Sequence, residues 1–483
     1  MLLDARLLLF YQRCNRRAFL DVYEDPSRQD QASDYLHKLM RDSWEHHQTV
    51  LNEWNYHQIK YIREDWQAGA DATRELMLQG VDCIHKGVLL YPDDRGVTLL
   101  SRPDLLVKCS TSTVPEKSDL GAWSYIPHQI KLGKRPKLDY QIVAAFHAWV
   151  LAQVQGLMPE TSILILRGRS DYQVNLAKLQ DRFLQTLNAC IQMLLSRTEP
   201  EVFISRQRCN LCRWYSSCYA TAKSELHLSL LAGVSQSRYD DLQTLGLTTT
   251  ESLSAVDPAV LEPVWSRPIA QQLVLQAKST LTGKALVKSD LTLLPVAPVE
   301  IYFDIEAEPQ LHLDYLLGLL VVDRSSGTDR FYPLLAEQPA DEQLIWEQFL
   351  ELVWRYPSAP IFHFYDYEVK TVRRLARLYQ TAAPQWEPLI TRLEDVHQLV
   401  TQGAILPVES YSLKSIARWV GFEWRDSDAS GAQSLYWYDQ WQKTGDRAFC
   451  EAIVRYNEDD CRATQRVKDW LWTFLREKDL NVG

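Results

Sequence analysis

The feature that most constrains the fold is an apolar segment, residues 299–304, which ends in an Asp-x-Glu pattern formed by Asp304 and Glu306. Side chains alternate between the two faces of a strand, so both carboxylates are expected on one face. Further along, Tyr456 and Asp460 are four residues apart in a predicted helix, a spacing that places both on one helix face. The sequence therefore predicts an acidic, metal-binding site on an α/β frame.

Predicted strands and helices alternate around these acids. The strands cover residues 299–304, 315–322 and 359–365, and the helices cover residues 366–379, 411–420 and 446–475. Asp366 and Glu368 both follow the third strand and compete as a middle acid of the site. Lys414, at the start of a predicted helix, could contact a phosphate.

The first part of the chain, residues 1–222, also reads as mixed α/β. It opens with helical sequence that includes the charged stretch 42–64, and further helices are predicted at 140–154 and 173–196. Strands are predicted at residues 87–90, 97–100, 105–108, 125–130 and 162–166.

A helical region and a linker separate the two α/β parts. Residues 223 to about 290 are predicted to be mainly helical, with Thr248 as an N-cap. Residues 293–298 contain Pro295 and Pro298, which block regular structure and indicate a linker. We therefore predict three regions, residues 1–222, 223–297 and 298–483.

Composition limits the class of protein. Of the 483 residues, 46% are hydrophobic and 24% are charged, which is typical of a globular chain. We expect no membrane span, because no apolar run is long enough, and a cytoplasmic location, because the N-terminus lacks the pattern of a secretory signal. The net charge of −10 argues against a uniformly basic surface but leaves room for local basic patches that bind nucleic acid.

Three cysteines, Cys209, Cys212 and Cys218, form a C-x2-C-x5-C pattern, a spacing suited to metal ligation. Cys14, which is flanked by arginines, is the best candidate for a fourth thiolate. Four thiolates suit either zinc or a [4Fe–4S] cluster, although zinc sites more often use two close pairs.

On these cysteines, residues 1–222 resemble the iron–sulfur branch of the RecB-like nucleases, in which one N-terminal and three C-terminal cysteines bind a [4Fe–4S] cluster. The resemblance implies a PD-(D/E)XK fold whose site residues match His46, Asp104, Lys131 and Gln141. Gln129 stands where the family has a carboxylate, which predicts weak magnesium binding and a degenerate site. Such a domain would still bind DNA, and a basic run is suited to phosphate: Lys134, Arg135 and Lys137.

Residues 298–478 resemble the DEDD exonucleases, which have an RNase H-like fold and hydrolyse phosphodiesters with two Mg²⁺ or Mn²⁺ ions. The resemblance implies that Asp304, Glu306 and Asp460 bind the metals and that Tyr456 positions water. The family pattern of an aromatic residue before the middle acid matches Tyr367 and Glu368, with Glu in place of Asp and with Asp366 as the competitor. Asp395 matches a nearby family feature, which implies a supporting role. The middle helices, residues 230–256, resemble a helix-hairpin-helix.

These resemblances imply a 3′→5′ exonuclease that acts on single-stranded DNA or unpaired ends, with repair or CRISPR-adaptation proteins as possible partners. Two alternatives stay open. The N-terminal site could also be active, which would make a dual nuclease, or both sites could be degenerate in a DNA-binding recruitment factor. The sequence does not distinguish DNA from RNA as the substrate.

Overall fold

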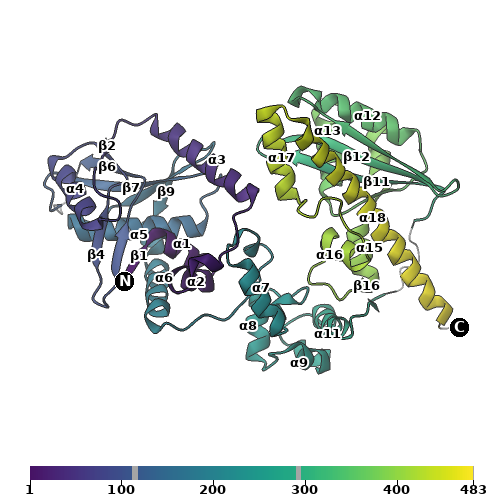
Figure 1. Ribbon diagram of the computed structural model, residues 1–483, viewed down its shortest axis with the longest axis horizontal. Helices are drawn as coiled ribbons and strands as arrows, with labels where there is room; N and C mark the ends of the chain where they lie inside the picture. Colours follow the sequence, from purple (N-terminus) through teal and green to yellow (C-terminus); the bar gives the residue numbers. More distant parts are fainter. Residues whose placement is uncertain (111–117, 290–294, 482–483) are drawn as a thin grey trace. The chain divides into compact units, whose positions relative to one another are not determined.

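The computed structural model describes residues 1–110, 118–289 and 295–481, and they form two compact units (Figure 1). Unit 1 comprises residues 1–202 and 206–221, and unit 2 comprises residues 203–205 and 222–483. The predicted linker shows no regular structure from Pro295 to Pro298, whereas Leu293 and Leu294 lie outside the described residues. No helix in the described chain is long and apolar enough to cross a membrane.

Unit 1 is built on a six-stranded mixed sheet and a three-stranded sheet. The larger sheet has the order β2 (His57–Gln58), β3 (Cys83–His85), β6 (Leu105–Ser110), β7 (Trp123–Lys131), β8 (Thr161–Leu166) and β9 (Tyr172–Asn175). The smaller one has the order β1 (Leu2–Asp4), β5 (Thr98–Ser101) and β4 (Leu89–Pro92). The helices are α1 (Ala5–Arg13), α2 (Asn15–Tyr23), α3 (Asp34–Leu51), α4 (Trp66–Gln79), α5 (Leu138–Gln155), α6 (Leu176–Ser196) and α7 (Tyr215–Ser224), the last of which continues into unit 2.

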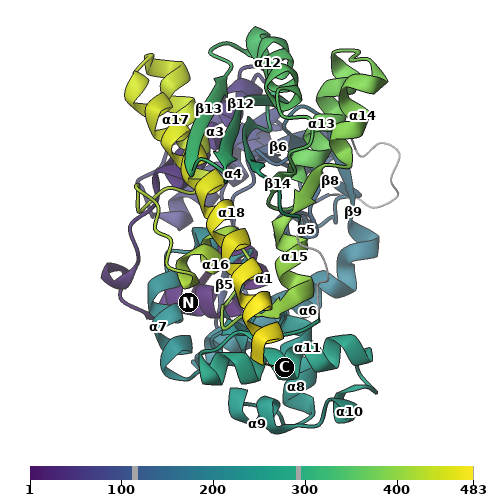
Figure 2. The same ribbon diagram turned by 90° about the vertical axis from the view of Figure 1, so that its right-hand side faces the viewer.

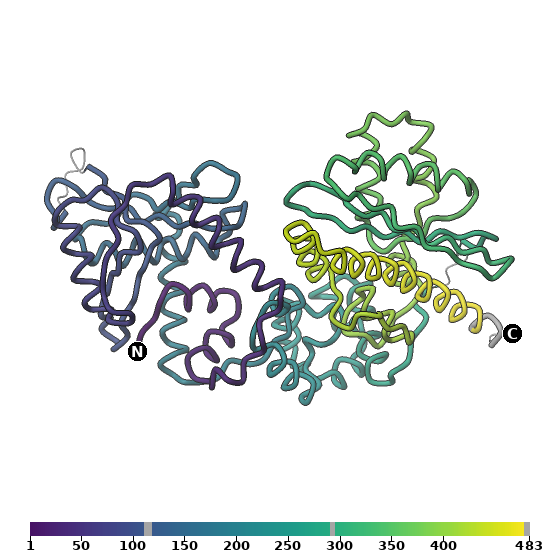
Figure 3. Tube along the Cα trace, turned by 45° about the horizontal axis from the view of Figure 1, so that its top comes forward, coloured from purple at the N-terminus to yellow at the C-terminus, as the bar shows by residue number. Residues whose placement is uncertain are grey.

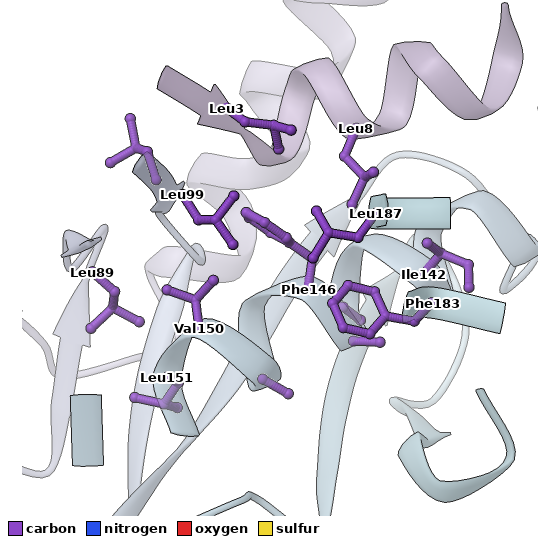
Figure 4. Close-up of a cluster of buried hydrophobic side chains, with 14 of the residues drawn as sticks. Leu3, Leu8, Leu89, Leu99, Ile142, Phe146, Val150, Leu151, Phe183 and Leu187 are labelled. Carbon is purple, nitrogen blue, oxygen red and sulfur yellow. The ribbon is translucent and has the colours of Figure 1, made fainter. Parts of the chain in front are cut away.

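The core of unit 1 forms around α5, which packs on β7 and β8 and is apolar on most of its surface. Figure 4 shows Phe146 and Val150 of α5 among leucines contributed by the small sheet and by α1 and α6. A helix that is buried on several sides needs apolar residues around most of its circumference, which explains its composition.

Three sequence predictions in unit 1 are corrected. The helix predicted through residues 42–64 ends at Leu51, because Trp54 and Tyr56 turn back onto the apolar cluster of β3 and β6. The helix predicted from residue 173 begins at Leu176, after a strand that pairs with β8, and the side chain of Asn175 caps its N-terminus. The strand predicted at residues 87–90 begins only at Leu89, because the chain turns after β3 at Lys86, which has a φ of 51°.

Unit 2 combines a helical region with a five-stranded sheet. The helices α8 (Gln236–Thr244), α9 (Thr250–Ala255), α10 (Pro258–Leu261) and α11 (Arg267–Thr282) share one apolar cluster. The N-cap of α9 is Thr249 rather than the predicted Thr248. The region is attached to the rest of the unit by β10 (Leu286–Val287), which pairs with β16 (Ala404–Ile405), and by a 2.7 Å hydrogen bond from Gln276 to the carbonyl of Leu406.

The five-stranded sheet has the order β13 (Thr328–Leu335), β12 (Leu313–Asp323), β11 (Val299–Glu308), β14 (Ile361–His363) and β15 (Leu393–Asp395). The helices of this part are α12 (Glu342–Trp354), α13 (Tyr367–Leu378), α14 (Ala383–Ile390), α15 (Val396–Gly403), α16 (Leu413–Trp419), α17 (Gly431–Thr444) and α18 (Arg447–Asn481). Helices α12 and α18 lie on opposite faces of the sheet (Figures 2 and 3).

The alternation of β11 separates apolar packing from the candidate site. Ile301, Phe303 and Ile305 pack in the cluster that contains the α12 aromatics, and the Phe303 and Phe349 ring centroids are 4.9 Å apart. Tyr302 points to the other face and packs with residues of α15, α16 and α18. Asp304 and Glu306 lie two and four residues after Tyr302, so their side chains point to the same face of the sheet and toward α18.

Candidate metal centre

Three carboxylates meet between β11 and α18. Asp304 and Glu306 come from β11 and Asp460 from α18, and each offers an oxygen within 4.8 Å of the others. Glu306 and Asp460 are buried, whereas Asp304 is partly exposed. These residues are brought together because α18 packs across β11 and β12, as the alternation and the helical spacing predict.

Each carboxylate accepts a hydrogen bond from a neutral donor. Asn457 Nδ2 lies 2.6 Å from Asp304 Oδ2, and Ser434 Oγ lies 2.6 Å from Glu306 Oε2. Trp424 Nε1 donates to Asp460 Oδ1 at 2.7 Å. Neutral donors orient the carboxylates without neutralising them.

The pKa values of the three acids are raised. Burial raises the pKa of Glu306 to about 8 and that of Asp460 to about 7. The pKa of Asp304 is raised well above its ordinary range by burial and by the charges of Asp460, Glu306 and Glu368. The three carboxylates repel one another when all are ionised, and a bound Mg²⁺ or Mn²⁺ ion would offset this repulsion. Their oxygens are hard ligands, which these ions prefer.

Tyr456 lies one helical turn before Asp460 and is buried. A hydrogen bond from its hydroxyl helps to lower the pKa of Asp460, opposing the effect of burial. The structure therefore places the predicted tyrosine in direct contact with the acid cluster.

The two candidates for the middle acid have different environments. Glu368 is 4% exposed, and its charge contributes to the raised pKa of Asp304. Its Oε2 atom is buried, and the nearest cationic or donor group given for it, His363 Nδ1, lies 3.5 Å away, which leaves the carboxylate able to bind a metal ion. Asp366 instead points to solvent and pairs with Lys370 at 2.5 Å. The arrangement favours Glu368 over Asp366.

A strained turn supports Glu368. Tyr365 has a φ of 71°, a value that bulky residues rarely adopt. It is held by a 2.5 Å hydrogen bond between its carbonyl and His363 Nδ1, and its amide donates to Asp395 Oδ1 at 3.1 Å. Asp395 also caps α15 through the amide of His397, so it acts as a supporting residue.

Sequence reasoning missed three residues that donate hydrogen bonds to the acids, Asn457, Ser434 and Trp424, and it missed Gly318, which lies against Asn457. Asn457 lies between Tyr456 and Asp460 in the sequence, and this position beside two predicted site residues was the one local signal of its role. Ser434 and Trp424 lie on segments for which the sequence predicted no element, and nothing in their local sequence indicates contact with β11 or α18.

The comparison with protein families agrees with this geometry. Residues 301–472 match the family model of the RNase_H superfamily. Unit 2 contains an RNase H-like domain. A search of curated proteins gives no match. The RNase H-like domain has a nuclease-type fold that typically uses divalent metal ions, and it implies a nucleic-acid substrate for the chain.

The site predicted in unit 1 contains one carboxylate, Asp104. His47, rather than the predicted His46, contacts it, with Nε2 3.1 Å from Asp104 Oδ1, and the amide of Ile130 donates to Oδ2 at 2.8 Å. Burial opposes ionisation, but the hydrogen bond from His47 and the charge of Lys131 lower the pKa of Asp104 to about 2. Asp104 is thus ionised, and neighbouring protein groups already offset its negative charge.

Gln129 is 2% exposed, and its Oε1 atom has no hydrogen-bond partner among the described residues. Gln141 donates to the carbonyl of Pro136 at 2.7 Å, a contact that shapes the loop before α5. The loop residues Lys134, Arg135 and Lys137 are exposed. The basic run is therefore accessible to solvent, whereas the side-chain amide of Gln129 is buried.

Two of the four cysteines predicted to bind a cluster, Cys212 and Cys218, pack beside Phe19 and Leu20 of α2. Cys14 caps α2, Cys209 begins a short 3-10 helix that Cys212 caps at its C-terminus, and Cys218 lies on α7. Burial raises the pKa of Cys212 and Cys218, and the charge of Cys14 acts on both thiols in the same direction. Arg16 and Arg17 also bind protein carboxylates here: Arg16 pairs with Glu199 at 2.5 Å, and Arg17 Nε lies 3.9 Å from Asp21 Oδ2. The Arg16 charge lowers the pKa of Cys218 and the Arg17 charge lowers that of Cys212, so both cations favour thiolates at this place.

Proposed function

We propose that the chain is a metal-dependent 3′→5′ exonuclease that acts on single-stranded DNA or unpaired ends. The observation that carries the proposal is the set of Asp304, Glu306 and Asp460, with Tyr456 bonded to Asp460, in an RNase H-like domain. Asp304, Glu306, Glu368 and Asp460 would hold Mg²⁺ or Mn²⁺. When bound, the ions supply an activated water and stabilise the leaving oxygen.

The protein groups would then have separate roles. Tyr456 would orient the attacking water beside Asp460, and the neutral donors would keep the acids in position. The partial exposure of Asp304 gives the scissile phosphate access to the acids. Unit 1 would bind DNA through its exposed basic run, in repair or in CRISPR-type DNA processing, as its resemblance to RecB-like nucleases implies.

The test is degradation of end-labelled single-stranded DNA and RNA with Mn²⁺, Mg²⁺ or EDTA. We expect metal-dependent shortening from the 3′ end of DNA and its loss in Asp304→Ala. Glu423→Ala, which changes an acid that is 78% exposed, is the matched control and should keep wild-type activity. Equal degradation by Asp304→Ala and wild type would refute the assignment, and no degradation of either polymer would favour the DNA-binding factor.

A dual nuclease is the second candidate, and the charged Asp104 beside Lys131 is the observation that favours it. It predicts that Asp304→Ala retains some cleavage and that the double variant, Asp304→Ala with Asp104→Ala, has none. The neutral Gln129 favours a binding role for unit 1 instead, in which case Asp104→Ala leaves cleavage unchanged.

We also propose that Cys14, Cys209, Cys212 and Cys218 hold a [4Fe–4S] cluster. The charges of Arg16 and Arg17, which favour the thiolate forms of Cys218 and Cys212, support an anionic group at this place. Broad visible absorbance and about four irons per chain after anaerobic purification would support the cluster. Stoichiometric zinc without iron would exclude it.

A further inference from the structure

Lys414 lies between two aromatic rings at the edge of the acid cluster. Its Nζ atom is 5.3 Å from the ring centroid of Trp424 and 5.4 Å from that of Tyr456. Both rings also donate hydrogen bonds to Asp460, through the Trp424 indole and the Tyr456 hydroxyl. Lys414 and Asp460 therefore contact the same two side chains.

The ammonium group of Lys414 forms no hydrogen bond or ion pair with any residue that the structure describes. Its charge nevertheless acts on Glu306 and Asp460 and favours their ionised forms. The side chain is half-buried, and burial lowers the pKa of Lys414. A half-buried cation with unused donors can bind an anion from outside the protein.

We propose that Lys414 binds a non-bridging oxygen of the phosphate that the substrate presents at the acid cluster. This inference rests on the proposed function, because metal ions on the acids would offset the charge that Lys414 otherwise faces. The flat faces of Trp424 and Tyr456 hold the ammonium by cation–π attraction and leave its N–H groups free for the phosphate. The ligand is thus a nucleotide with a phosphate, rather than a nucleoside.

The alternative is that Lys414 only balances the charge of the acids. The two roles differ in what removal of the ammonium group changes. A pure counterion would affect metal affinity and leave nucleotide affinity at saturating metal unchanged. A phosphate ligand would affect nucleotide affinity at saturating metal.

The experiment measures binding of thymidine 5′-monophosphate and of thymidine to the full chain by calorimetry at saturating Mn²⁺. We compare wild type with Lys414→Met and Lys414→Arg. Lys370→Met is the matched control, since Lys370 is exposed and already paired with Asp366. Thermal unfolding of each variant verifies that it is folded.

We expect Lys414→Met to bind the monophosphate about tenfold or more weakly, because a charge-assisted hydrogen bond is lost. Lys414→Arg should retain most of the affinity, Lys370→Met should match wild type, and thymidine binding should be the same in all four proteins. Equal monophosphate affinity in Lys414→Met and wild type would overturn the proposal, as would no monophosphate binding by metal-loaded wild type. Neither result depends on turnover, so the cleavage assay with Asp304→Ala tests the nuclease function separately.

Discussion

Gly318 leaves the space that Asn457 occupies. Gly318 lies opposite Asp304 in the antiparallel pairing of β11 and β12, and a β-carbon at this glycine would be 1.5 Å from Asn457 Oδ1. Asn457 Nδ2 in turn donates to Asp304 Oδ2 at 2.6 Å. The absence of one side chain on β12 thus allows α18 to deliver a donor to the acid cluster.

Gly318→Ala should destabilise the protein and weaken Mn²⁺ binding. The new methyl group would overlap Asn457, and β12 and α18 pack too closely to move apart without a loss of stability. Overpacking of this kind costs roughly 1–3 kcal/mol. Thermal unfolding and metal titration measure the two effects. Gly431→Ala is the control, since its β-carbon would meet no atom within 4 Å.

A double-mutant cycle with Asn457→Ala isolates the contact. Removing the amide makes room for the new methyl group, so Gly318→Ala should cost less in the Asn457→Ala background. Additive losses of stability would show that the two residues do not conflict.

Glu368→Gln should abolish most cleavage, because Glu368 is buried beside Asp304, whereas Asp366→Asn should retain it. Single-turnover cleavage rates of both variants, at saturating Mn²⁺, measure the difference. The reverse pattern would assign the middle position to Asp366.

Metal-free protein should lose stability as pH rises from about 6.5 to 9. The pKa of Glu306 is raised to about 8 and that of Asp460 to about 7, so the folded state binds more protons than the unfolded state in this range. The stability that protonation maintains is lost as pH rises through these values. Unfolding temperatures in EDTA should therefore fall with pH.

Asp304→Asn serves as the reference for this pH dependence. It removes one of the like charges, so its unfolding temperature should fall less steeply, and Mn²⁺ should stabilise wild type more at pH 9 than at pH 6.5. Parallel pH profiles of wild type and Asp304→Asn would contradict the coupling among the acids.

Cys218→Ser should reduce iron content and visible absorbance, if the four cysteines hold a cluster, because it removes one thiolate from the set. Cys109→Ser should leave both unchanged, since Cys109 contacts Ser124 on β7 and lies on a different element from the four cysteines. Iron and sulfide analysis of anaerobically purified proteins measures the effect. Equal loss in both variants would point to general destabilisation.

Local sequence was sufficient for the strand that carries Asp304 and Glu306 and for the helix that carries Tyr456 and Asp460. Their periodicities are properties of neighbouring residues, and the structure has both elements. The same reasoning extended the helix of α3 too far, because Trp54 and Tyr56 are directed by packing on distant strands rather than by their neighbours.

Only the tertiary structure decided which residues support the acids and which acid is buried with them. Ser434, Trp424 and Gly318 reach the cluster through contacts between segments far apart in sequence, and no local pattern encodes such contacts. Asp366 and Glu368 are two residues apart and equally acidic, yet the start of α13 turns one toward solvent and the other toward Asp304. Sequence determines the local periodicity of a segment, whereas burial and charge coupling arise when the chain packs.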